Sequence, residues 1–119
     1  MINRIETIES ALNVTLPNQY REFINEIGII SDERGEVYGY IEGIDTNEIP
    51  CVIGATQKYS STNTQITTAD IVIAFDDYLN SPVILHTESG EILIIDINGN
   101  RHHKAGSFDE WFCGLTGDH

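Results

Sequence analysis

Apolar residues recur every three or four positions in three stretches of the chain, which is the spacing typical of amphipathic helices. These stretches lie at residues 5–12, at residues 17–28 and after Ser107. The second stretch is the clearest, because Pro17 suits a first helical turn and Gly28 suits a helix end. Its apolar face comprises Tyr20, Phe23, Ile24 and Ile27. The pattern therefore predicts two N-terminal helices and one C-terminal helix.

The C-terminal helix carries its own start signal. Ser107 is followed three residues later by Glu110, which is the spacing of a capping box. Phe108, Trp111 and Phe112 then share one apolar face. Because Trp111 offers the largest apolar area in the chain, we expect it to anchor this helix on a sheet.

Most of the chain between these helices has the alternation and β-branched content of strands. The segments are DIVIAFD at 70–76, PVILHT at 82–87, EILIIDI at 91–97 and NRHHKA at 100–105. Turn signals separate the last three, and Asn98-Gly99 favours a two-residue type I′ turn. An earlier run, EVYGYIEGI at 36–44, also predicts a strand, with a bulge near its glycines.

Residues between Cys51 and Asp70 give helix and strand signals of about equal strength. The run IPCVIGA is typical of a strand, whereas ATQKYSS favours a short helix around residues 55–60, and we prefer the helix. The polar segment STNTQITTAD predicts a surface loop. We therefore expect one α+β domain over residues 1–119, mostly an antiparallel sheet meander packed by two N-terminal helices and one C-terminal helix.

The charge balance changes which partners are reasonable. Six Lys and Arg against nineteen Asp and Glu give 6 − 19 = −13. Such a surface repels phosphate backbones and anionic lipid, so we expect neither direct nucleic-acid binding nor membrane binding. The acidity favours a basic protein partner or serves only to keep the protein dispersed, and the charge alone leaves both interpretations open.

No pattern of reactive residues points to catalysis. Asp76 and Asp77 end a predicted strand, but neighbours on a strand face opposite sides, and the same holds for His102 and His103. Cys51 and Cys113 lack ligand spacing, so we expect reduced thiols that serve as small apolar groups. We therefore expect no metal, no cofactor and no enzymatic activity. Acidic residues interrupt the N-terminal apolar positions, which argues against a secretory signal and favours the cytoplasm.

The order of these elements, together with particular residues in them, resembles the SUKH superfamily of the Smi/Knr type. The residues that carry the resemblance are Leu16, Pro17, Tyr20 and Phe23, then Ile27 and Gly28, then Ala55, Thr56 and Tyr59, then Phe75, Asp76 and Asp77, and finally Ser107, Phe108, Trp111 and Phe112. The resemblance implies a single SUKH-like domain. It also implies a function, since many bacterial members are immunity proteins that neutralise a co-inherited toxin, often a nuclease, and other members are regulatory or scaffolding domains.

Together, the resemblance and the charge lead to one expected function and one alternative. The expected function is a cytoplasmic bacterial immunity protein that binds a cognate toxin domain, basic in character and in the leading case a nuclease. The alternative is a regulatory or scaffolding module with an endogenous partner. The sequence carries no signal for the oligomeric state. The expected partner-binding residues are Asp45, Glu48, Asp76, Asp77 and Tyr78.

Overall fold

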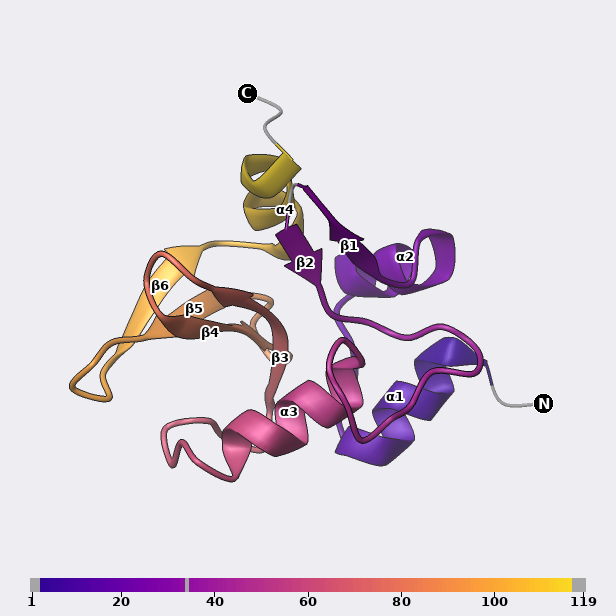
Figure 1. Cartoon of the computed structure of the whole chain (residues 1–119), viewed down its shortest axis with the longest axis horizontal. Coiled ribbons are helices and arrows are strands. Elements are labelled where there is room, and N and C mark those ends of the chain that lie inside the picture. The colour runs from indigo at the N-terminus through magenta and orange to yellow at the C-terminus, as the bar shows by residue number, and fades with distance from the viewer. Residues whose placement is uncertain (1–2, 34, 117–119) are drawn as a thin grey trace.

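The computed structural model describes residues 3–33 and 35–116, which form four helices and six strands in the order shown in Figure 1. The elements are α1 (Arg4–Leu12), α2 (Asn18–Glu26), β1 (Ile30–Asp32), β2 (Gly35–Val37), α3 (Val52–Ser60), β3 (Asp70–Asp76), β4 (Ser81–His86), β5 (Ile92–Ile95), β6 (Arg101–Ala105) and α4 (Phe108–Thr116). The predicted α+β class is confirmed. So are the two N-terminal helices and the C-terminal helix.

The main sheet is a four-stranded antiparallel meander in the order β3-β4-β5-β6. A separate two-stranded sheet, β1-β2, lies beside it near α2 and α4. Helix α3 packs along β3, and α1 packs against both α2 and α3 (Figure 1). The strands predicted between residues 70 and 105 are therefore confirmed in number, order and pairing.

An aromatic cluster joins α4 to α2. The ring centroid of Phe108 lies 5.2 Å from that of Tyr20 and 5.4 Å from that of Phe23. Phe108 is only 2% exposed, whereas Trp111 is half-buried at the edge of the core. The buried anchor of α4 is thus Phe108. Trp111, expected to anchor this helix on the sheet, packs against the core as a half-buried ring, because helical spacing identifies the inward face but not how deep each side chain lies.

The strand expected at residues 36–44 is the main error of the sequence analysis. Strand β2 ends at Val37, and Gly39 makes only an isolated bridge with Cys51. Gly39 packs so closely that a Cβ atom there would lie 1.8 Å from the carbonyl oxygen of Gly28. The chain therefore bends past this contact and does not continue a ladder. Ile27 also departs from expectation, because it is 45% exposed just beyond α2.

The open question between Cys51 and Asp70 resolves in favour of the helix. Helix α3 begins at Val52, three residues earlier than expected, because its first turns are buried against β3. Helix α3 also covers the edge of β3 that does not pair with β4. There the Thr56 hydroxyl accepts a hydrogen bond from the Val72 backbone N–H at 2.9 Å. The segment 61–69 contains no helix or strand, as predicted for a surface loop.

Two smaller expectations also need correction. Gly99 has a φ of +85° but Asn98 does not have a positive φ, so the β5–β6 turn is not of type I′. The Asp96 carboxylate stabilises a different turn by accepting hydrogen bonds from the Asn98 and Asn100 N–H groups, both at 2.9 Å. Cys51 is buried as expected, but Cys113 is exposed.

Candidate functional site

Helix α4 and the end of β3 meet at a surface feature that we call the Trp111 corner. It consists of Trp111 with the three carboxylates of Glu36, Asp76 and Asp77, and Tyr78 follows directly in the β3–β4 turn. Two hollows of about 220 and 370 Å³ adjoin here, and both are lined by Trp111 and Asp76. The corner therefore places an aromatic side chain between two openings in the surface.

Trp111 combines firm support with access from outside. Its ring packs on Phe108, with 5.9 Å between the centroids, and Phe108 is itself buried in the core. The rest of the indole borders the two hollows, and the side chain stays half-buried. A rigid aromatic side chain with unfilled space beside it is typical of the anchors that dominate protein–protein binding energy.

The charges around the smaller hollow are of one sign. Glu36, Asp76 and Asp77 line it, and none of the described residues that line it is basic. The larger hollow adds Glu110 and one cation, Lys104, which forms no ion pair with any residue that the structure describes. The corner is thus a local concentration of carboxylates beside an aromatic surface.

A neighbouring tyrosine also experiences this negative charge. Burial raises the pKa of Tyr38 well above its usual value, and the hydroxyl of Tyr59 and the carboxylates of Glu36 and Asp77 raise it further. The Tyr59 ring stacks on Phe75 with 5.8 Å between the centroids. The end of β3 is therefore held by a packed aromatic layer, while its carboxylates remain at the surface.

The structure brings together three of the five predicted partner-binding residues. Asp77 is exposed and Tyr78 is 95% exposed, while Asp76 is half-buried and accepts a hydrogen bond from the Leu79 N–H at 2.9 Å. These three form the end of β3 and its turn.

The other two predicted residues lie elsewhere. Asp45 and Glu48 are exposed in the 41–50 loop, which runs past α1 across the molecule from the β3–β4 turn (Figure 1). The Asp45 carboxylate accepts a hydrogen bond from the Asn47 N–H at 2.9 Å.

Sequence reasoning missed two members of the corner. The sequence pattern places Glu36 in a strand and Trp111 in the core, and it indicates a binding role for neither. Glu36 reaches the corner because β2 folds back next to β3, and no local signal encodes that approach. For Trp111 a signal does exist, because Phe108 on the same helix face already supplies one large buried ring.

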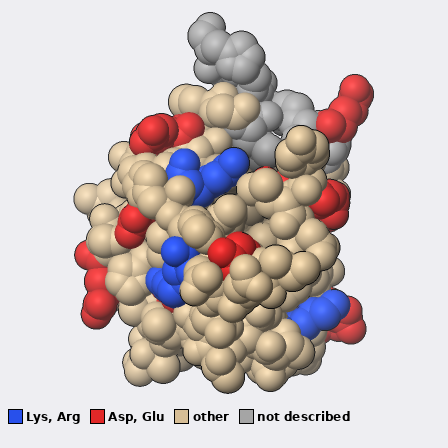
Figure 2. Space-filling model, turned by 90° about the vertical axis from the view of Figure 1, so that its left-hand side faces the viewer, with Lys and Arg blue, Asp and Glu red and all other residues tan. Residues whose placement is uncertain are grey.

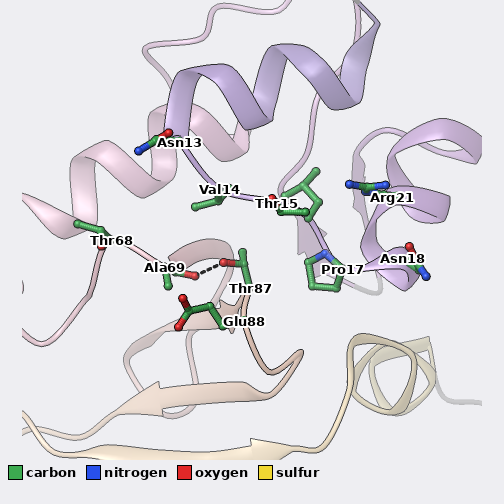
Figure 3. A pocket seen from close by; sticks show the side chains of 11 residues that line it. Asn13, Val14, Thr15, Pro17, Asn18, Arg21, Thr68, Ala69, Thr87 and Glu88 are labelled. Atoms are coloured by element: carbon green, nitrogen blue, oxygen red, sulfur yellow. Dashed lines mark hydrogen bonds between the residues drawn. The ribbon is translucent and has the colours of Figure 1, made fainter.

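A third hollow, larger than the two at the corner, lies on another part of the molecule and has mixed character. It measures about 650 Å³ and lies between the α1–α2 linker and the end of β4 (Figure 3). Arg21 and Glu88 bring opposite charges to its wall. The Arg21 guanidinium is already paired, with 3.0 Å between its Nη2 atom and a Glu9 carboxylate oxygen. The same Glu9 oxygen accepts the Leu16 N–H, so this arrangement primarily holds the linker.

A buried ionic cluster resembles catalytic chemistry but has a structural explanation. The Asp70 carboxylate lies 2.5 Å from Arg101 Nη1 and 2.7 Å from His86 Nδ1, and it accepts the Thr67 N–H at 2.8 Å. Burial alone would raise the pKa of Asp70, but the hydrogen bonds from Arg101, Thr67 and His86 lower it below its usual value. The cluster ties the first strand of the sheet to the last. Within residues 3–33 and 35–116, no three His, Cys, Asp or Glu side chains could hold a metal ion together.

Comparison with known families decides the classification. The family model described as SMI1-KNR4 cell-wall, SUKH_6, matches residues 2–112. The chain belongs to the SUKH superfamily. No curated protein matches it. The superfamily includes immunity proteins, and its domains are generally binding proteins without catalytic activity, which agrees with a site built from an aromatic anchor and carboxylates. No helix in the described part of this SUKH chain is long and apolar enough to cross a membrane.

Proposed function

We propose that this SUKH protein is a cytoplasmic bacterial immunity protein that binds a cognate toxin domain at the Trp111 corner. The observation that supports this most is the half-buried Trp111 between two hollows, next to the carboxylates of Glu36, Asp76 and Asp77. A toxin that acts on nucleic acid needs a positive cleft for its substrate, and an acidic corner complements such a cleft. Occupying the cleft blocks the toxin without any chemistry by the immunity protein.

The two kinds of residue at the corner divide the work of binding. Exposed carboxylates attract a basic surface over several ångströms and speed the encounter. Aromatic side chains then hold the complex by burying a large apolar area, which slows dissociation. Tyr78 and Trp111 are the aromatic residues placed for the second task.

A specific observation also favours the alternative function. On the face drawn in Figure 2, basic and acidic side chains are interspersed among uncharged ones and do not form a continuous acidic surface. This distribution is what solubility alone requires. A regulatory or scaffolding module with an endogenous partner therefore remains the second candidate. The genes beside this one separate the two functions, because an immunity protein is encoded next to its toxin.

The experiment compares two exposed residues on different turns. Tyr78→Ala removes a ring that is 95% exposed, and Ile97→Ala removes a side chain that is 100% exposed in the β5–β6 turn. Neither change should disturb the fold. Against the toxin domain encoded beside the gene, Tyr78→Ala should dissociate about tenfold faster than the parent, or more, and protect cells less well. Ile97→Ala should match the parent in both assays. Absence of binding by the parent chain contradicts the proposed function.

A further inference from the structure

The small sheet meets the main sheet where β2 contacts β3. Strand β2 runs beside the end of β3, yet the described residues of the two segments share only one backbone hydrogen bond, from the Tyr38 N–H to the Ile73 carbonyl oxygen at 2.6 Å. Beyond it the strands separate. Gly35 and Glu36 then lie on one side, and Ala74 to Asp77 on the other, of the hollow of about 220 Å³. We call this gap the split.

Backbone geometry shows that both walls of the split present polar groups to it. Successive backbone groups of a strand point to alternate sides, so the N–H of Glu36 points to the same side as that of Tyr38, toward β3. In β3 the alternation is interrupted by a bulge at Ile73, between the pairs Val72–Ile84 and Ala74–Val83. The Val72 N–H points away from β4, toward Thr56, and one extra residue at the bulge turns the Ala74 groups toward β4. The next residue, Phe75, therefore points its carbonyl away from β4, toward β2. No hydrogen bond connects these groups of Glu36 and Phe75 across the split. The split is therefore bordered by two free strand edges that face each other.

Two residues at the split bear on whether it could close. Gly35, which pairs with Asp32 in the β1–β2 ladder, has a φ of +122°, outside the usual range of strands. Trp111 and Val83 line the bottom of the gap, so direct pairing of β2 with the end of β3 would have to displace the indole. On its other side, β3 pairs Phe75 with Pro82, which has no N–H to donate, as suits a pair whose backbone groups point away from each other.

We infer that the split is a strand-addition site that takes an extended segment of the partner in which basic residues alternate with apolar ones. The free edges supply the main-chain hydrogen bonds that such recognition uses. The lining of the split suits such a segment, because Trp111 and Val83 offer apolar contact and Glu36, Asp76 and Asp77 offer negative charge. This inference rests on the proposed function, since it names how the toxin is held.

The test uses a probe peptide and the full chain labelled with ¹⁵N. The probe is acetyl-Lys-Val-Lys-Val-Lys-Val-Lys-amide. The matched control is the same peptide with every valine amide N-methylated, which keeps the charge and the side chains but removes the donors along one edge. Binding is followed by the amide signals of Glu36 and Phe75, the indole signal of Trp111, and hydrogen exchange of the Glu36 amide.

The inference predicts saturable shifts of these three signals and at least about tenfold slower exchange of the Glu36 amide with the unmodified peptide. The N-methylated peptide should bind at least about tenfold more weakly. Equal binding of both peptides shows attraction by charge alone and overturns the inference. So do shifts confined to another part of the molecule, such as the hollow of Figure 3, and no binding at about 1 mM peptide.

Competition with the toxin domain keeps the two proposals distinguishable. A toxin that displaces the peptide supports both. A toxin that binds tightly without displacing it supports the proposed function and overturns the split as its interface. If the peptide binds as predicted and the toxin does not bind at all, the strand-addition site stands and the proposed function fails.

Discussion

Strand β3 carries an aspartate at each end, and the two carboxylates have opposite surroundings. Asp70, at the start, is buried and contacts Arg101, His86 and the Thr67 N–H. Asp76, at the other end, is half-buried and receives a hydrogen bond from its own turn, beside a hollow whose described lining contains no basic residue. The start of the strand is closed by paired charges, whereas its end borders a hollow at the surface.

The two aspartates illustrate two kinds of carboxylate that contribute to the net charge of −13. Other carboxylates resemble Asp70 in having a cation of this chain as partner, as in the pairs Glu9–Arg21 and Glu42–Arg4. These pairs hold the two N-terminal helices and their loops in place. The carboxylates at the Trp111 corner have no such partner among the described residues that line the smaller hollow. The corner is therefore one place where carboxylates lie beside an aromatic side chain.

The largest effect is expected at the closed end. Asp70→Ala leaves Arg101 without its carboxylate partner inside the sheet, which should lower the free energy of unfolding by about 3 to 5 kcal/mol. Asp76→Ala removes one hydrogen bond within a turn and should cost about 1 kcal/mol or less. Denaturant unfolding measures both values. Similar losses for the two variants would remove the distinction between the ends.

The same contrast should hold for the two aromatic residues of α4. Phe108→Ala creates a cavity between α2 and α4 and should cost about 3 to 5 kcal/mol. Trp111→Ala removes a half-buried ring, so about 1 to 2 kcal/mol is expected despite its larger size. Chemical denaturation of both variants tests this order. A larger loss for Trp111→Ala would place the indole in the core and weaken its assignment as a partner anchor.

Lowering the pH should weaken the interactions of Asp70 and reduce the free energy of unfolding. Because the pKa of Asp70 is lowered in the folded protein, its contribution to stability is complete above the ordinary value of about 3.9 and is lost as the pH falls through the folded value. The parent should therefore lose stability below about pH 4 more steeply than Asp70→Asn, which has no carboxylate to protonate. Unfolding free energies measured from pH 6 downward give the two slopes. Parallel slopes would mean that the pKa of Asp70 is not lowered by its partners in the folded protein.

The sequence predicts the parts of this structure that depend on residues close together in the chain, and it fails where distant residues meet. The meander and the helices rest on local periodicity, which is strong in this chain, and they are confirmed. The strand expected at residues 36–44 is wrong because Gly39 serves a contact with Gly28, eleven positions away, that no local pattern encodes. The pair of Asp70 and Arg101 spans 31 positions and crosses the sheet, so it also lies beyond any spacing rule.

The candidate site shows the same limit. Asp77 and Tyr78 are exposed because they lie in the β3–β4 turn, between two strands that the sequence predicts. Glu36 joins them only because β2 folds back beside β3. Asp45 and Glu48 have the same acidic character and lie in a different region, since composition identifies charge but not position.

The central claim is that binding depends on the location of the acidic corner and not on total charge. Two matched variants test it: Asp76→Lys with Asp77→Lys at the corner, and Asp45→Lys with Glu48→Lys in the 41–50 loop. Each replaces two negative charges by two positive ones, so −13 becomes −13 + 4 = −9 in both, and each removes one carboxylate that caps its own turn. The two proteins differ mainly in where the charge changes.

The measurement is the association rate of each variant with the toxin domain encoded beside the gene, at low and high salt. The corner variant should associate at least about tenfold more slowly than the parent at low salt, the loop variant should differ from the parent by less than about threefold, and both effects should shrink as salt rises. Equal slowing of the two variants would mean that total charge alone drives the encounter, and a larger effect of the loop variant would move the interface away from Trp111.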